Sequence, residues 1–471
     1  MKERYIGLSV AEFVSIQDIC IHKKVNEHGR ARIRGIIPAE SEETLFKRAE
    51  GGYATLFITD ETGQRQNIFS GIIDSMEVKN SGEVKSADIV LAGATKLLDC
   101  TVHTRTFQNG AMLYGELLRT IHSEYGQAVM YLQNCGQEES AKKLIVQYRE
   151  TDWEFAKRLA SHFNQPLIPN YAAEGIRYSF GLCEASPEKD LEVNGYSVGN
   201  EKEEYLNKSR NKVSGILPDD FTFYTVKSRD YAEVGDKIRF MGQIFYVYEA
   251  ESRMDGEELI HTYILRRAGG FKTVHGHNNR IIGASLDATV LAAKNDTVKV
   301  AVSADKDPKE ADARWFPYST VYSSPDGTGW YCMPEKGDKV RLYFPSEQEE
   351  EGYVISAINY GNTGASGPGN APRSDPDRKS ISNKQGKQIE LTPTTITLTN
   401  NNGMSICLDD EKGIEIKCNK NVELNAEGNL IMKSDMGLDI QATNYIELVQ
   451  GSSRLILQDE LKIEGTKFNV Q

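Results

Sequence analysis

The sequence of 471 residues lacks any run of 18 apolar residues, which excludes an ordinary membrane-spanning helix. Its first residues, Met1 to Tyr5, contain no apolar signal core, so we expect synthesis in the cytoplasm and no export by the Sec route. The sequence has no G-x-S-x-G elbow and no phosphate-binding glycine loop. Two frequent sequence signals of an enzyme are therefore missing.

Paired cysteines and an excess of positive charge are also absent. The seven cysteines are scattered without a C-x-x-C pair, which favours free thiols in a reducing compartment over a disulfide framework. Acidic residues number 68 against 55 lysines and arginines, so the net charge is −13 and binding to a phosphate backbone is disfavoured. We therefore expect no nucleic-acid partner, in a chain long enough for three or four domains.

The C-terminal part of the sequence repeats a short pattern in which two apolar residues flank one residue, and the pattern returns every eight positions. Looser copies flank this run, for example at Ile389/Leu391 and Leu455/Leu457. Several glycines, among them Gly403 and Gly413, lie in or near the intervening turns. The regular pairs are Ile406 and Leu408, Ile414 and Ile416, Val422 and Leu424, Leu430 and Met432, Leu438 and Ile440, and Ile446 and Leu448.

The i, i+2 spacing within each pair places both side chains on one face of a β-strand. A strand this short cannot bury its own apolar stripe, so such repeats must stack and close against something else. Three identical chains wound around one axis would each supply one wall of a prism. The pattern therefore predicts a triple-stranded intertwined β-helix formed by a homotrimer, with the listed pairs at its axis. A flat antiparallel meander is the alternative, but it would want longer strands.

The rest of the sequence predicts a mainly β protein with a helical insertion. Residues 1–100 form a first β-rich domain, with strands at 31–37, 54–59, 67–73 and 86–91. Residues 101–275 contain the helical insertion and a second β-rich domain with strands at 237–240 and 243–248. Residues 276–361 form a small barrel of the oligonucleotide/oligosaccharide-binding (OB) type. A Gly/Pro-rich neck at 362–385 and the repeat at 386–471 follow.

Two helices are expected in the insertion. An apolar face predicts one at about 112–125. Thr151 and Glu154 form a capping-box pattern at the start of the second, whose buried stripe includes Phe155, Leu159 and Phe163. Trp153 on this helix is expected in the core.

The order of these parts resembles the spike of contractile injection machines. That family includes VgrG of type VI secretion and the hub-and-spike proteins of contractile phages, tailocins and extracellular injection particles. Several segments carry the resemblance: Leu97–Cys100, Arg105–Asn109, Gln147–Phe155 with Arg158 and Leu159, Trp315–Pro317, Pro334–Val340, and Ile406–Asp410 with Gly413–Ile416.

The resemblance implies β-barrel hub domains, an OB-fold domain and a trimeric needle. It also implies a set of partners: the hexameric, Hcp-like inner tube, baseplate wedge proteins, and a PAAR-type tip protein with effectors at the C-terminal end. Contact with the target membrane would be transient. The sequence departs from some relatives, because no lysozyme domain lies between barrel and needle and no histidine follows His277. The end at Phe468–Gln471 carries no appended toxin, and no cofactor is implied.

Two segments offer candidate chemistry. His275 and His277 are a close histidine pair, which suits a metal site, but the Gly/Asn surroundings favour an interdomain loop. The acidic run from Glu347 to Glu351 suits a calcium or acid/base cluster, but a solvated loop at the barrel rim is favoured. The OB barrel lacks a basic, aromatic-rich strand face, which argues against nucleic-acid binding.

The leading hypothesis is a non-enzymatic, homotrimeric spike that caps the inner tube, joins it to the baseplate and pierces the target envelope. A trimeric tailspike that degrades polysaccharide or peptidoglycan is the alternative, and it would need paired carboxylates in a groove. The acids of the needle, such as Asp409, Glu415 and Glu423, lie at outward or turn positions. An adhesin would want a knob after the repeat, which this sequence does not show.

Overall fold

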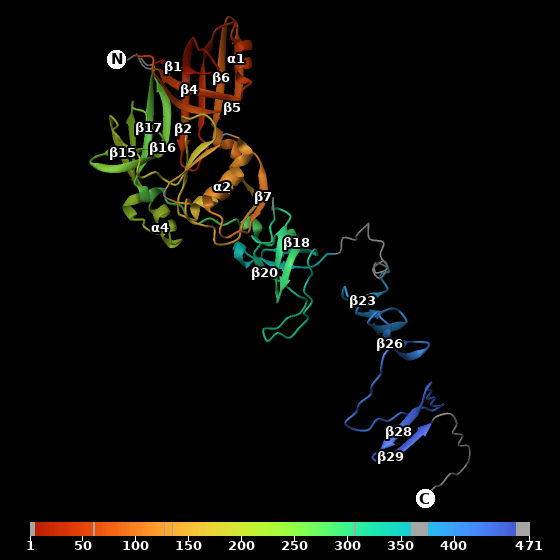
Figure 1. Ribbon diagram of the computed structural model, residues 1–471. Coiled ribbons are helices and arrows are strands. Elements are labelled where there is room, and N and C mark those ends of the chain that lie inside the picture. Colours follow the sequence, from red (N-terminus) through yellow and green to blue (C-terminus); the bar gives the residue numbers. More distant parts are fainter. Residues whose placement is uncertain are drawn as a thin grey trace. The chain divides into compact units, whose positions relative to one another are not determined.

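The computed structural model describes residues 5–59, 62–126, 128–133, 135–305, 308–358 and 375–457. Strands account for 44% and helices for 14% of the described residues, so the chain is mainly β as the sequence predicted. It divides into two compact units, Met1–Tyr360 and Gly361–Gln471 (Figure 1). No helix in the described ranges is both long and apolar enough to cross a bilayer.

One sheet of twelve strands dominates the first unit (Figure 1). Its order is β1-β4-β5-β6-β3-β2-β16-β17-β14-β13, and β15 joins β12 to β16. The pairing of β2 with β16 connects strands from two distant regions of the sequence. The strands are β1 (Tyr5–Leu8), β2 (Ser15–Lys24), β3 (Arg30–Ile37), β4 (Tyr53–Thr59), β5 (Arg65–Ser81), β6 (Val84–Gly93), β12 (Glu188–Lys189), β13 (Tyr196–Asn200), β14 (Thr222–Ser228), β15 (Lys237–Phe240), β16 (Gln243–Asp255) and β17 (Glu258–Arg266).

Alternation of side chains explains which face of this sheet is buried. Ala31 and Ile33 on β3 are buried, whereas Arg32 and Arg34 between and beyond them lie on the exposed face and pair with Asp88 of β6. Helices α1 (Glu42–Ala49) and α4 (Lys202–Arg210) were not predicted, because neither has a broad apolar stripe. Both helices have acidic residues in the first turn and basic residues in the last, an arrangement that the helix dipole stabilises.

A helical layer with two small sheets follows in the chain. The two expected helices are confirmed, and Thr151 with Glu154 forms the predicted capping box. Trp153 is buried, as expected. The elements are α2 (Tyr114–His122), α3 (Asp152–Ser161), the pair β7 (Val102–Phe107) and β9 (Ile145–Thr151), and the sheet β10 (Leu167–Pro169), β11 (Arg177–Phe180) and β8 (Val129–Leu132). Short 3-10 helices are η1 (Ala94–Asp99), η2 (Ser123–Tyr125), η3 (Pro218–Phe221), η4 (Ala268–Phe271), η5 (Asn279–Ile281) and η6 (Glu349–Glu351).

A five-stranded barrel of the OB type ends the first unit. A parallel bridge between Tyr318 and Val354 brings its two outer strands together. Leu144 and Val146, which precede or lie on β9, are fully buried in the barrel's hydrophobic core. Strand β9 of the helical layer therefore contributes to the core of the barrel, while the helices keep a separate core. The strands follow the order β20-β19-β18-β21-β22 and are β18 (Ser285–Lys294), β19 (Thr297–Val302), β20 (Trp315–Pro317), β21 (Lys339–Tyr343) and β22 (Tyr353–Ile355).

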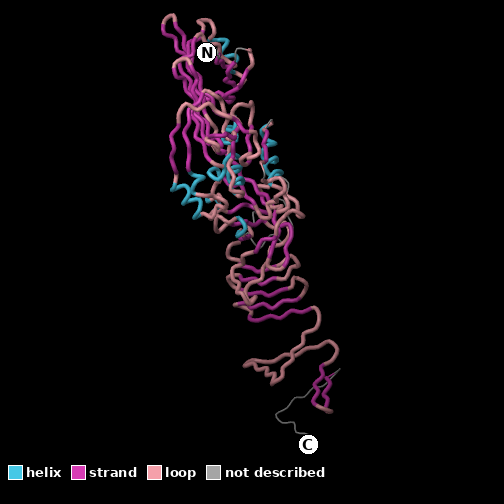
Figure 2. Tube along the Cα trace, turned by 90° about the vertical axis from the view of Figure 1, so that its left-hand side faces the viewer, coloured by secondary structure: helices cyan, strands magenta, loops and turns pink. Residues whose placement is uncertain are grey.

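The second unit contains an antiparallel meander of five strands, visible as successive rungs in Figure 2, and a separate hairpin. The part of the expected neck at 362–374 and the end of the repeat at 458–471 lie outside the described residues. Residues 419–445 contain no strand. The meander strands are β23 (Lys379–Ser382), β24 (Gln388–Leu391), β25 (Thr395–Thr399), β26 (Met404–Asp409) and β27 (Gly413–Cys418), and the hairpin strands are β28 (Ile446–Gln450) and β29 (Ser453–Leu457).

Candidate functional site

The meander presents one continuous apolar face. The strand register places aliphatic pairs directly opposite one another across four strands. Because opposite residues in a ladder share a face, these side chains form two parallel columns. We call this surface the apolar face, and its residues are 40–73% exposed. They are Ile389, Leu391, Ile396, Leu398, Ile406, Leu408, Ile414 and Ile416.

Only some of the twelve residues predicted at the needle axis come together within one chain. The four on β26 and β27 lie on the apolar face. Ile446 and Leu448 lie on one face of the hairpin, opposite Leu457 and Leu455. The remaining six lie outside strands and are 59–69% exposed: Val422, Leu424, Leu430, Met432, Leu438 and Ile440.

The described part of the second unit has no core of its own. From residue 375 to residue 457, no side chain falls in the buried class. The single chain forms a meander over residues 379–418, which is the alternative weighed from the sequence. Its apolar face nevertheless has no covering layer among residues 375–457. A second surface is needed to bury it.

The segments that resemble family motifs meet in a buried polar network in the first unit. Arg105 on β7 donates from Nη1 to Asp152 Oδ1 at 2.6 Å and to Gln147 Oε1 at 2.8 Å. Tyr125 Oη and Gln147 Nε2 also donate to Asp152, at 2.6 and 2.8 Å. Burial raises the pKa of Asp152, but the hydrogen bonds from Arg105, Tyr125 and Gln147 outweigh burial and hold it below its usual value. Asp152 is therefore an ionised, fully paired carboxylate.

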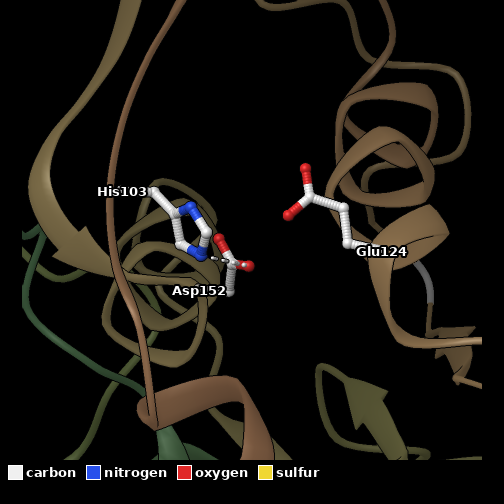
Figure 3. A group of neighbouring side chains, drawn as sticks. All are labelled: His103, Glu124 and Asp152. Carbon is white, nitrogen blue, oxygen red and sulfur yellow. Dashed lines mark ion pairs between the residues drawn. The ribbon is translucent and has the colours of Figure 1, made fainter.

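One group in this network has the residue types of a metal site: His103, Glu124 and Asp152 (Figure 3). Figure 3 shows His103 directed at Asp152, with Glu124 extending from a separate segment. Arg105 Nη2 donates to His103 Nδ1 at 2.9 Å and to Glu124 Oε2 at 2.8 Å, while its Nη1 binds Asp152. A guanidinium is always a donor, so Nδ1 of His103 accepts and the ring proton is on Nε2. The positive charge of Arg105 thus takes the position that a cation would need, and these residues do not fit a metal.

A second ion network ties the helical layer to the barrel. Arg158 on α3 donates from Nη2 to Glu150 Oε2 at 2.8 Å and from Nη1 to Glu349 Oε1 at 2.9 Å. Glu349 belongs to the acidic run for which a solvated loop was favoured, and for this residue the prediction is wrong. Glu349 is only 6% exposed, because Arg158, 191 positions away, compensates its charge.

The segment Arg105–Asn109 makes further contacts between the helical layer and the barrel. Gln108 Nε2 donates to Val300 O at 3.0 Å and to Asp305 Oδ2 at 2.8 Å, and Thr106 Oγ1 also bonds Asp305. Asn109 Nδ2 donates to Asp312 Oδ1 at 3.1 Å. Burial raises the pKa of Asp305 to about 6, although a hydrogen bond from Gln108 lowers it. We call the contacts of this segment and of Arg158 with the barrel the seam.

The histidine pair lies in the connection between these parts. The ring of His275 stacks on His162, with centroids 4.6 Å apart at 15°, and His277 lies 4.8 Å from His275. Among the described residues, neither histidine belongs to a group of three ligand-type side chains close enough to hold one metal ion. Stacked rings do not converge their nitrogens on one point, so this geometry favours the loop over the metal.

One arrangement has the connectivity of a catalytic triad. His28 lies between the Thr95 hydroxyl, 2.9 Å from Nδ1, and the Asp99 carboxylate, 2.9 Å from Nε2. Thr95 is only 2% exposed, and Trp153 packs on the His28 ring at 4.9 Å. A nucleophile needs access to its substrate, so this group is structural.

Comparisons with known proteins agree with this architecture. The family model of the phage tail baseplate hub (GPD) matches residues 31–163, and the type VI secretion system/phage-baseplate injector OB domain matches residues 287–358. No curated protein matches the chain. The E. coli c3393 protein, described as a type VI secretion component similar to the T4 bacteriophage tail proteins gp27 and gp5, is 12% identical. The alignment covers 75% of this chain and 100% of that one, with a TM-score of 0.54.

Two PdpA–VgrG complexes are also similar. The half-lidded complex from Francisella is 10% identical over 88% of each chain, with a TM-score of 0.56. The lidless complex is 10% identical over 88% of this chain and 98% of that one, with a TM-score of 0.57. Identities this low show a shared fold. The chain therefore carries a segment that matches the phage tail baseplate hub family, followed by one that matches the injector OB domain, and in this order it resembles the VgrG and contractile-tail hub-and-spike proteins.

Proposed function

We propose that three copies of this chain form a non-enzymatic spike at the tip of a contractile injection apparatus. The coarser assignment, a structural protein of the baseplate hub and VgrG type, follows from the two matched domains. The observation that carries the finer proposal is the apolar face, together with the absence of any buried side chain between residues 375 and 457.

The physical reason is the exposure of aliphatic side chains to water. Fully burying one Leu or Ile stabilises a protein by roughly 1.5–3 kcal/mol, and each chain presents eight such residues on the apolar face alone. A chain without a core cannot offset the entropy of ordering its strands. Identical partners supply an identical face, and a repeat of eight residues fits one wall of a three-sided prism. The axis would contain the paired aliphatics from Ile406 to Leu448.

The other parts follow from this assembly. The twelve-stranded sheets of three copies would form a ring that receives the hexameric inner tube and contacts the baseplate wedge proteins. The needle would carry the force of contraction to the target envelope, make transient contact with the target membrane, and hold a PAAR-type tip protein or effector at its end. The seam would transmit that force between hub and barrel, since the buried Arg158–Glu349 ion pair joins them and Leu144 and Val146 enter the barrel's core.

The proposal is tested by the mass of the purified chain in solution. Light scattering is expected to give three times the chain mass of 52.6 kDa, and electron micrographs are expected to show a broad base with a thin rod. A folded, protease-resistant monomer would contradict the proposal. A trimer that hydrolyses capsule or peptidoglycan would contradict its non-enzymatic part.

A further inference from the structure

The free edge of strand β8 exposes outward backbone groups, three of which bind nothing in the described chain. β8 is the outer strand of its three-stranded sheet and pairs only with β11. Val129 N donates to Ile176 O at 2.8 Å and Gln133 N donates to Phe180 O at 3.0 Å, so these residues direct their backbone toward β11. In a parallel pair the residues between these, Met130 and Leu132, direct their backbone N–H and C=O groups away from β11 and toward the free edge.

Of these outward groups, one has a partner within the described residues. Leu132 O accepts a hydrogen bond from Gln137 Nε2 at 3.0 Å. The N–H groups of Met130 and Leu132 and the carbonyl of Met130 remain open. Natural sheets protect such edges with lysine, proline, a bulge or a covering segment. The strand Val129–Leu132 is uncharged and contains no proline, so its sequence does not prevent another strand from pairing.

A groove runs along this edge. Its volume is about 750 Å³, within the usual range of binding clefts. The strand segment 128–133 lines one side, and Arg119, His122 and Ser123 from α2 and the turn after it contribute to the rest. An edge strand beside a helix is a geometry that accepts an extended peptide as an added strand.

The groove carries one kind of charge. The side chain of Arg119 is exposed and makes no ion pair or hydrogen bond with any other described residue. His122 also lines the groove, but burial lowers its pKa to about 4, and it is bonded to Tyr178 at 2.8 Å, so it is neutral at physiological pH. No acidic side chain lines the groove, although the whole chain has a net charge of −13. A carboxylate is the complementary group for an unpaired guanidinium.

We propose that the β8 edge is a docking site for an extended segment of a partner protein, which adds to the sheet as a fourth strand and places a carboxylate on Arg119. Backbone hydrogen bonds to Met130 and Leu132 give the affinity, and the guanidinium selects an acidic segment. This surface is independent of the apolar face, because it lies in the first unit and needs no trimer axis.

The test uses the full chain and an eight-residue peptide probe. The probe alternates threonine and valine around one central glutamate, with both ends blocked, and a matched peptide has lysine in place of glutamate. Fluorescence anisotropy is expected to show binding of the glutamate peptide at least tenfold tighter than that of the lysine peptide. The Arg119→Glu variant is expected to reverse this preference, whereas Arg210→Glu on the exposed helix α4 leaves it unchanged.

A second variant removes the hydrogen bond itself. Met130→Pro deletes an outward N–H that the sheet does not use, and proline is tolerated at such an edge position. This variant is expected to bind the glutamate peptide at least tenfold more weakly than the parent chain, with an unchanged circular dichroism spectrum. If the variant does not fold, the parent chain is tested with a peptide N-methylated at alternate amides, which is expected to bind at least tenfold more weakly.

The proposal is overturned if neither peptide binds below about 1 mM, if both bind equally, or if Met130→Pro or N-methylation changes nothing. Self-association of the parent that Met130→Pro abolishes would also overturn it, because a second copy would then occupy the edge.

Discussion

Replacing Ile416 by aspartate is expected to prevent trimer formation, whereas the same replacement at the neighbouring Lys417 is not. The two residues are adjacent on β27 but lie on opposite faces. Ile416 is opposite Ile406 on the apolar face, and Lys417 is opposite Ser405 on the polar one. The two variants, Ile416→Asp and Lys417→Asp, therefore introduce the same carboxylate into the same strand. They differ only in the face of the strand on which the carboxylate lies.

The expected magnitude follows from burial and charge. Each chain would lose roughly 1.5–3 kcal/mol of apolar burial at Ile416. Bringing an unpaired carboxylate into an apolar contact costs a few kcal/mol more. In a three-fold assembly three such carboxylates meet at one level, so the loss is on the order of 10 kcal/mol per trimer. At Lys417, whose side chain is 65% exposed, the loss is an exposed ion pair with Glu415, worth about 0–1 kcal/mol.

The assay is light scattering of both variants at equal concentration, with gel mobility in SDS without heating as a second readout. Ile416→Asp is expected to be monomeric or aggregated, and Lys417→Asp trimeric. A stable trimer of Ile416→Asp would refute the assignment of this face to the axis.

Three further predictions concern the first unit. Arg158→Ala is expected to lower the free energy of unfolding in denaturant by about 3–5 kcal/mol, because it leaves the buried Glu349 without a compensating charge, whereas Arg30→Ala, which breaks an exposed pair, costs about 0–1 kcal/mol. The raised pKa of Asp305 makes the folded state bind a proton that the unfolded state releases between about pH 4 and 6. Its contribution to stability is present below this window and is lost as pH rises through it, so melting curves of Asp305→Asn are expected to lack that decline; an unchanged decline would assign it to other groups. A chelator is expected to leave the melting temperature unchanged, since Arg105 supplies the positive charge in the group of His103; a fall on chelation, restored by zinc, would show a metal there.

Local signals in the sequence located many elements well. The capping box at Thr151 marked the start of α3, since the cap depends only on residues three positions apart. Alternation marked six of the twelve strands of the large sheet, namely β3, β4, β5, β6, β15 and β16. The apolar pairs at Ile406 and Ile414 indicated both strands and their shared face, because a turn of fixed length keeps the register.

Contacts between distant residues were not readable in the same way. The pairing of β2 with β16 and the ion pair of Arg158 with Glu349 depend on the fold of the whole unit. The acidic run looked solvated because its partner lies far away in the sequence. The apolar pairs between residues 422 and 440 show a further limit of one chain, since they form no strand there, and the prism stays a prediction.

The burial of Leu144 and Val146 in the core of the OB barrel has a consequence for how such proteins diversify. A chimaera that exchanged the barrel alone, by a cut in the connection near residue 275, would leave these two side chains facing a foreign interior. We therefore expect that genetic exchange and engineering replace the helical layer and the barrel together as one unit. The parts of the chain on either side of this unit can vary independently of it.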